Sequence, residues 1–250
     1  MLENRPRVIN DYIFKKIFSK KGNREYNEDY VMHRQDNNRF CFVLADGLGG
    51  HGKGDLASKC VCESVLEDFD NDCEDFSLEK AIQNAQKKLL DLQREMNCSM
   101  GMKTTIVILY VEKDNAQWAH IGDSRLYLWD KWRMLDRTYD HSVPQMLVYA
   151  KEIKEKEIRF HEDRNRLLRA MGNRNDDLKA DISEKKKCKK GQAFLLCSDG
   201  FWEYIEEKKM WFYYLNSKKP EEWLEKMEKT ICENGRDSDM DNYSAIAVWI

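Results

Sequence analysis

The sequence has few prolines, no long apolar run and no linker of low complexity. Only 3 of the 250 residues are proline. No segment rich in proline, glycine and serine divides the chain, so we expect one domain over residues 1–250. The longest apolar runs, such as Ile106 to Val111, are far shorter than the roughly 20 residues of a membrane-spanning helix. The N-terminus has no apolar core of a signal peptide, so we expect a cytoplasmic protein without a membrane partner.

The sequence also lacks an excess of either charge and lacks paired cysteines. It contains 42 basic and 45 acidic residues, a formal net charge of −3. This balance argues against a nucleic-acid partner. The 8 cysteines form no CxxC pair, and no histidines and cysteines stand at zinc-binding spacing. We therefore interpret them as reduced thiols, mostly buried.

One stretch, residues 40–58, combines a buried strand with a glycine-rich turn. Phe40 to Ala45 is an apolar run typical of a buried strand, and it ends at Asp46 and Gly47. Further glycines at positions 49, 50, 52 and 54 allow a tight backbone before a helix expected over 55–69. A carboxylate in this setting suits a hard cation or a phosphate. The alternative is an ordinary strand-to-helix turn with a capping acid.

Acidic residues recur at the ends of other apolar strands. These are Asp123 after a strand at 115–121, Asp199 after a strand at 192–198, Asp241 before a strand at 243–250, and Glu28 with Asp29 before a strand at 30–34. Clustered carboxylates repel one another unless they hold protons or a cation. Oxygen ligands suit Mg²⁺ or Mn²⁺, and a pair of such ions can activate water for phosphoester hydrolysis. Arg24 could hold phosphate oxygens with its planar guanidinium group.

The remaining pattern predicts a mixed α and β chain. We expect a first strand at 12–18, a helix at 77–97 capped by Ser77, an antiparallel meander of strands at 104–111, 115–121, 124–129 and 131–135, short surface helices within 143–164, short strands at 166–171 and 178–183, and helices at 206–215 and 221–234.

Eight stretches, in order, resemble bacterial-type PP2C (PPM) protein serine/threonine phosphatases. They are GNREYNED (22–29), FVLADGLGGHGKGDLAS (42–58), GMKTTIVILYV (101–111), AHIGDSRLYLW (119–129), DHS (140–142), NRLLRAMG (165–172), FLLCSDGFWEYI (194–205) and DNYSAIAVWI (241–250). The resemblance implies an α+β fold, a four-layer α-β-β-α sandwich in which two central antiparallel sheets are flanked by helices.

The resemblance also implies roles for the acids. Two Mn²⁺ or Mg²⁺ ions would be bridged by Asp46. Glu28 and the Gly47 carbonyl would complete one site, and Asp199 with Asp241 the other. Asp123 and Asp199 would hold a third, weaker metal. Arg24 falls at the family's phosphate-binding arginine, and Asp29 would orient metal-bound water. Attack by that water would leave no covalent phosphoenzyme.

The chain departs from animal family members at Leu48, where they carry a histidine proposed as the general acid. His51 is nearby, but a lone histidine beside glycines is more often a packing residue, and His141 is more plausibly structural. Residues 142–164 match the family's variable flap, which we expect to be mobile and to influence substrate choice.

The resemblance implies phosphoprotein substrates, an opposing serine/threonine kinase and its targets as partners, and we expect a monomer. Two alternatives stay open: a pseudophosphatase acting as a regulatory phosphoprotein-binding module, and a hydrolase of small phosphoesters.

Overall fold

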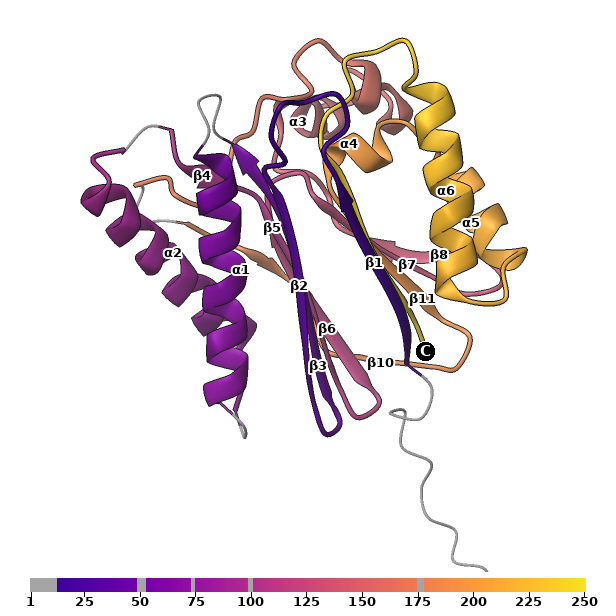
Figure 1. The fold of residues 1–250 in the computed structure, drawn as a ribbon. Helices are drawn as coiled ribbons and strands as arrows, with labels where there is room; N and C mark the ends of the chain where they lie inside the picture. The colour runs from indigo at the N-terminus through magenta and orange to yellow at the C-terminus, as the bar shows by residue number, and fades with distance from the viewer. Residues whose placement is uncertain (1–12, 49–52, 73–74, 99–100, 175–177) are drawn as a thin grey trace, which may run out of the picture.

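Two antiparallel sheets lie face to face, and helices cover both outer faces (Figure 1). The computed structural model describes residues 13–48, 53–72, 75–98, 101–174 and 178–250. The predicted four-layer α-β-β-α sandwich is confirmed. Within these ranges no helix is both long enough and apolar enough to cross a membrane.

The first sheet has the strand order β10-β6-β5-β3-β2, with β4 on β3 and β9 on β6. Its strands are β2 (Asp29–Asp36), β3 (Arg39–Leu48), β4 (Lys103–Thr104), β5 (Ile106–Glu112), β6 (Asn115–Ile121), β9 (Asp181–Ile182) and β10 (Lys186–Lys187). The helices α1 (Gly54–Asn71) and α2 (Leu78–Glu95) cover its outer face. As predicted, Ser77 caps α2, and its side chain accepts a hydrogen bond from the Lys80 amide.

The second sheet has the order β1-β12-β11-β7-β8. Its strands are β1 (Phe14–Lys20), β7 (Arg125–Trp129), β8 (Met134–Arg137), β11 (Ala193–Cys197) and β12 (Tyr243–Trp249). The short helix α4 (Asp199–Trp202) follows β11, and α5 (Glu207–Leu215) and α6 (Pro220–Asn234) cover the outer face. Two further short helices, α3 (Val143–Tyr149) and η2 (Glu155–Phe160), belong to the flap segment.

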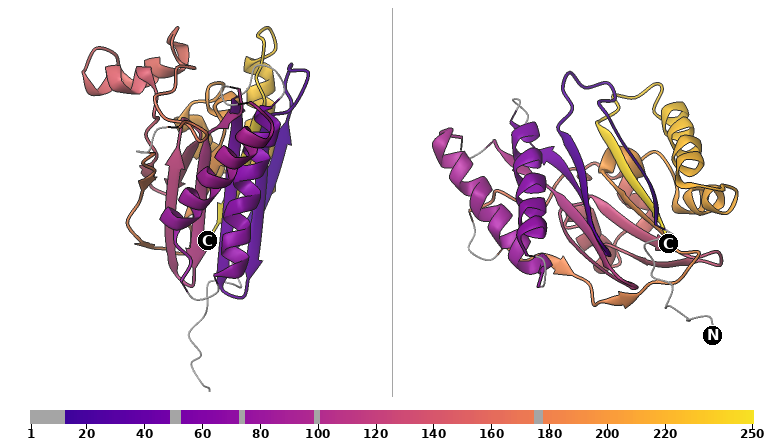
Figure 2. Two further views of the ribbon diagram at one scale, coloured as in Figure 1. Left: turned by 90° about the vertical axis from the view of Figure 1, so that its left-hand side faces the viewer. Right: turned by 60° about the horizontal axis from the view of Figure 1, so that its bottom comes forward.

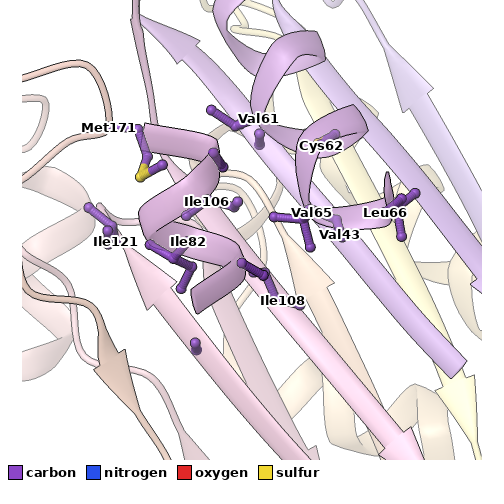
Figure 3. Packing of buried hydrophobic residues seen from close by; sticks show 14 of the residues in the cluster. Val43, Val61, Cys62, Val65, Leu66, Ile82, Ile106, Ile108, Ile121 and Met171 are labelled. Carbon is purple, nitrogen blue, oxygen red and sulfur yellow. The ribbon is translucent and has the colours of Figure 1, made fainter. Parts of the chain in front are cut away.

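The core divides into three apolar layers because side chains alternate along each strand. In β3, Phe42 and Leu44 pack between the two sheets, whereas Val43 faces α1 and α2. Figure 3 shows Val43 beneath Val65 of α1, in the layer between the helices and the first sheet. Both faces of each central strand are therefore buried, which explains their nearly continuous apolar runs.

The expected meander over 104–135 is wrong at one joint. β5 and β6 belong to the first sheet, but β7 and β8 belong to the second. The chain crosses between sheets at Gly122, whose φ of +104° is available only to glycine without strain. Apolar alternation looks the same on either side of this joint, so the pattern does not tell which sheet a strand joins. The crossing places Asp123 at the boundary between the sheets.

Two other expected strands are shorter or absent. Residues 166–171 make only isolated bridges, Ser142 to Leu167 and Thr104 to Met171. The strand expected at 178–183 is reduced to β9. The last strand of the expected meander, β8, begins later than predicted. The expectations for Tyr12, Gly49, Gly50, His51 and Gly52 lie outside the described residues.

Candidate active site

Strand pairing brings the predicted acids to one end of the sandwich, uppermost in Figure 1 near the labels β4 and α4. Asp29 of β2 pairs directly with Asp46 of β3. In the second sheet, Cys197 of β11 pairs with both Arg125 of β7 and Ala245 of β12. Asp199 follows β11 at the start of α4, Asp123 precedes β7, and Asp241 precedes β12. Antiparallel pairing therefore gathers acids from distant parts of the chain.

A cavity of about 790 Å³ opens at this end of the sandwich. Its lining includes every predicted site residue except Asp29, namely Arg24, Glu28, Asp46, Gly47, Asp123, Asp199 and Asp241. Leu48 also lines the cavity, together with Tyr26 from the loop before β2 and Asn165 from the segment after the flap. Half of the residues that line the cavity are thus aspartate or glutamate.

Two threonines fix the main chain of Asp46. Its carbonyl oxygen accepts hydrogen bonds from the Thr104 hydroxyl and the Thr105 amide, each 2.8 Å long. Its amide donates to the Thr105 hydroxyl over 3.0 Å, and that hydroxyl lies 2.7 Å from the Ser124 hydroxyl. Both threonines are fully buried. The same side chain therefore links Asp46 of the first sheet to the turn that carries Asp123.

Gly54 permits a close approach of the Glu28 carboxylate to α1. The Gly54 amide donates to Oε1 of Glu28 over 3.1 Å. A Cβ atom at position 54 would lie 2.7 Å from the same oxygen, closer than side-chain atoms pack. The glycine at this position is therefore explained by contact with a predicted metal ligand and not only by the turn.

Burial and mutual repulsion raise the pKa values of the clustered acids. The pKa values of Asp46 and Asp123 lie well above the ordinary range, first because of burial and then because of neighbouring carboxylates. Burial, followed by the charge of Asp241, raises the pKa of Asp199 to about 6. Carboxylates clustered in this way require protons or a cation to offset their repulsion.

Asp29 lies under the cluster and is only 5% exposed. Its Oδ2 accepts a hydrogen bond of 2.7 Å from the Ser198 hydroxyl. Its Oδ1 has no hydrogen-bond partner among the described residues. Burial raises the pKa of this carboxyl to about 7. A buried carboxylate oxygen without a donor suits a bound water held by a cation.

Arg24 stands at the rim of the cavity, with 43% of its side chain exposed. Its Nε and Nη2 donate to the two carboxylate oxygens of Asp241, each over 3.1 Å. Its Nη1 donates to Asp239 over 3.2 Å. The guanidinium fork is thus already held in the plane that suits two oxygen acceptors.

Three functional positions escaped the sequence analysis. Asn242 accepts the Glu28 amide over 2.7 Å and donates to the Tyr26 carbonyl, so it shapes the loop before β2. Glu203 is partly buried one helical turn after Asp199, and desolvation followed by the charge of Asp199 raises its pKa to about 7. Its spacing of four residues from Asp199 was a usable signal. Trp202 donates from its indole to the Asp123 carbonyl over 3.0 Å.

A second group, His120, His141 and Asp181, brings its possible ligand atoms within 4.8 Å of one another. No three acids of the cavity, as the structure describes it, meet that spacing. However, the Gly122 amide donates to Nδ1 of His141 over 3.2 Å, so the ring proton sits on Nε2, which faces Asp181 at 3.2 Å. The two imidazole rings are stacked, with centroids 4.6 Å apart. Nε2 of His141 also lies 3.3 Å from Nη1 of Arg169, so both ring nitrogens have protein partners, and His141 braces Gly122 through Nδ1.

The acids of the cavity, by contrast, fit hard divalent cations. The acids provide carboxylate oxygens, and Gly47 provides a main-chain carbonyl oxygen. Both are ligand types of Mg²⁺ and Mn²⁺. Burial and neighbouring carboxylates raise the pKa values of Asp46 and Asp123, and a bound cation would offset this negative charge.

The flap projects from the body beside this end of the molecule, in the salmon-coloured segment of Figure 2, left. Its second half is tied to the second sheet's helices. Arg159 is 9% exposed and donates to the carbonyl oxygens of Trp202 and Ile205, each over 2.9 Å, and to Glu207. The expected short helices are present as α3 and η2.

Comparison with known proteins gives consistent matches. The sequence model described as Protein phosphatase 2C matches residues 19–240. The serine/threonine phosphatase stp of Listeria welshimeri is 32% identical over 198 residues, which are 75% of this chain and 77% of that protein.

Among solved structures, the serine/threonine phosphatase Stp1 from Staphylococcus aureus has a TM-score of 0.83 and 25% identity, covering 94% of each chain. The catalytic domain of the phosphatase PstP in complex with 2 manganese ions has a TM-score of 0.80 at 23% identity, with 95% of this chain and 97% of that chain covered. The latter likeness shows a shared fold.

Proposed function

This chain belongs to the protein phosphatase 2C family and is a protein phosphatase, and we propose that it hydrolyses phosphoserine and phosphothreonine in proteins with the help of two divalent metal ions. The observation that supports the proposal is the gathering of the five predicted metal-binding acids, which adjoin strands of both sheets, in one cavity beside an arginine. The phosphatase names of the curated relatives point in the same direction.

We propose that Asp46 bridges the two ions, that Glu28 and the Gly47 carbonyl complete one site, and that Asp199 and Asp241 complete the other. Asp123 and Asp199 would hold a third, weaker ion. Either Mn²⁺ or Mg²⁺ suits these oxygen donors. When bound, such ions supply an activated water as nucleophile and offset the charge of the phosphate. Water attacks phosphorus directly in this proposal, and no phosphorylated side chain forms.

Two side chains have separate tasks. The guanidinium of Arg24 would exchange part of its contact with Asp241 and Asp239 for two phosphate oxygens, and so orient the phosphate for attack. Asp29, with one unpartnered oxygen, would orient the metal-bound water. Leu48 cannot donate a proton, so the leaving serine or threonine oxygen would take its proton from a water in the cavity.

Residues 1–250 would act as one phosphatase domain with a flap at 142–164. Its substrates would be targets of an opposing serine/threonine kinase, and the enzyme would work as a cytoplasmic monomer. The described cysteines are free thiols, which suits a reducing compartment. A pseudophosphatase is not favoured, because the five predicted metal-binding acids are all present and line one cavity.

The test is phosphate release from a phosphothreonine peptide with Mn²⁺, with Mg²⁺ and with EDTA. Asp46→Asn and Asp199→Asn should each lower release by at least about 100-fold, because each substitution removes a charged ligand from the centre of the cluster. Asp114→Asn is the matched control, since Asp114 lies in the turn between β5 and β6 and pairs with Lys187. No metal-dependent release from folded wild-type protein would refute the proposal.

A further inference from the structure

Trp202 lies in α4 and is only 2% exposed. It contacts three separate parts of the molecule. Its indole Nε1 donates to the carbonyl oxygen of Asp123 over 3.0 Å. Its ring faces the guanidinium of Arg125, whose Cζ lies 3.4 Å from the ring centroid. Its own carbonyl oxygen accepts a hydrogen bond from Arg159 of the flap.

The turn that carries Asp123 is fixed on its other side. The amide and carbonyl of Gly122 both form hydrogen bonds with His141, the first to Nδ1 over 3.2 Å and the second to the amide over 2.9 Å. Ser124 contacts Thr105. Trp202 joins this turn to the chain segment of Asp199, in addition to the pairing of Arg125 with Cys197.

α4 is a single helical turn that begins at Asp199 and ends at Trp202. Residues three apart on a helix lie on the same face, so the carboxylate and the indole are carried by one rigid unit. The indole hydrogen bond therefore sets where the Asp123 main chain sits relative to Asp199. Asp123 and Asp199 both line the cavity described above, so the two residues face the same space.

The buried ion pair of Arg125 with Asp140 keeps the indole in place. Arg125 donates to both carboxylate oxygens of Asp140, over 2.8 and 2.6 Å, and its side chain is 2% exposed. A guanidinium against an indole face is an attractive contact, strongest away from water. Rotation of the Trp202 ring would uncover the guanidinium charge of Arg125. The indole N–H therefore stays directed at the Asp123 carbonyl.

We infer that Trp202 is a positioning residue that holds Asp123 at the separation from Asp199 needed for the two carboxylates to share a cation. The inference rests on the proposed function, because it refines how the third, weaker ion would be bound. Trp202 does not touch substrate, and it acts through the main chain of Asp123.

The test measures Mn²⁺ binding by calorimetric titration and by electron paramagnetic resonance, without substrate. Trp202→Phe keeps an aromatic ring against Arg125 but removes the N–H donor. We expect the weakest Mn²⁺-binding step to lose about fivefold or more in affinity, the order of one hydrogen bond. The tighter steps should change by less than about twofold.

Trp223→Phe is the matched control. Trp223 is fully buried, and its indole donates to the Met210 carbonyl over 2.8 Å, under the helices of the second sheet. Both variants lose a buried indole hydrogen bond and some thermal stability. Only Trp202→Phe should change metal affinity. A second variant carries β-(3-benzothienyl)alanine at position 202, which keeps the bicyclic ring and replaces the N–H by sulfur, so it tests the donor alone if the phenylalanine variant folds poorly.

Three outcomes decide the matter. If both position-202 variants have the same Mn²⁺ dissociation constants as wild type, the inference is overturned and the proposed function stands. The same holds if the wild-type chain shows two Mn²⁺-binding steps and no third. A wild-type chain that binds no Mn²⁺ overturns the proposed function and this inference with it. In an Asp123→Asn background, removing the indole N–H should have no further effect on Mn²⁺ binding.

Discussion

Replacing Asp29 by asparagine should stabilise the metal-free protein at alkaline pH. The side chain is buried, and its pKa is raised from 3.8 to about 7. Since its pKa is higher in the folded than in the unfolded chain, stability is present at low pH and is lost as pH rises through about 7. Asparagine keeps the volume and the acceptor for Ser198 but carries no charge.

The size of the effect follows from the difference between the two pKa values. Each pKa unit corresponds to about 1.4 kcal/mol. The raised pKa of Asp29 therefore destabilises the fold by up to about 4 kcal/mol at pH 8, where the side chain is ionised, and by about 2 kcal/mol at pH 5, where the folded chain must keep it protonated. For a chain of this length, 1 kcal/mol shifts Tm by about 2–4 °C. In EDTA, Asp29→Asn should therefore raise Tm by roughly 10 °C at pH 8, and by about half as much at pH 5.

The assay is thermal unfolding of wild type, Asp29→Asn and Asp114→Asn across this pH range, with EDTA and with Mn²⁺. Asp114 is an exposed control, 44% accessible. Mn²⁺ favours the ionised carboxylate, so the advantage of Asp29→Asn should shrink or reverse when the metal is present. A gain in Tm that is the same at pH 5 and pH 8 would show that Asp29 is not titrating in the folded protein, and the reasoning would fail.

Two further substitutions test the cavity. Arg24→Ala should raise KM for a phosphopeptide by about 10- to 100-fold, the range of a charge-assisted bidentate contact, with less effect on kcat. Arg34→Ala is the control, because it removes a surface ion pair with Asp70. Equal KM values in the two variants would mean that Arg24 does not bind the phosphate. Gly54→Ala should weaken Mn²⁺ binding more than tenfold, because the new Cβ would lie 2.7 Å from the Glu28 carboxylate. Gly101→Ala is the control and should leave Mn²⁺ binding unchanged, since the nearest neighbour of its Cβ would be Cys98 Sγ at 3.6 Å. Calorimetric titration with Mn²⁺ measures both affinities, and unchanged affinity in both variants would mean that Glu28 is not a ligand.

Much of the fold was predictable because its signals are local. Apolar runs marked the central strands, and Ser77 with the stripe that follows it marked α2. The acids were recognised because each one interrupts an apolar strand at its end. In an antiparallel pair, the start of one strand lies beside the end of the other, so acids at these positions come together, as the direct pairing of Asp29 with Asp46 illustrates.

The rest was hidden because it depends on single long-range contacts. The crossing at Gly122 changes sheets without any change in hydrophobic pattern. Thr105 and Trp202 act on the site through hydrogen bonds to main-chain or hydroxyl groups far away in sequence. Such residues look like ordinary members of a strand and a helix. Their roles follow only from the register that the packed sheets adopt.

This dependence on packing explains how the fold tolerates so much clustered charge. Glu28, Asp29 and Asp46 belong to the first sheet, whereas Asp123, Asp199 and Asp241 adjoin strands of the second. The two sets meet only because apolar side chains such as Phe42 and Leu196 pack the sheets together. Burial of that layer offsets the repulsion among the acids, at roughly 25 cal/mol per Å² of apolar surface. The spacing between the two sets of ligands is therefore a property of the inter-sheet core, and a change in that core moves one set relative to the other without altering any acid.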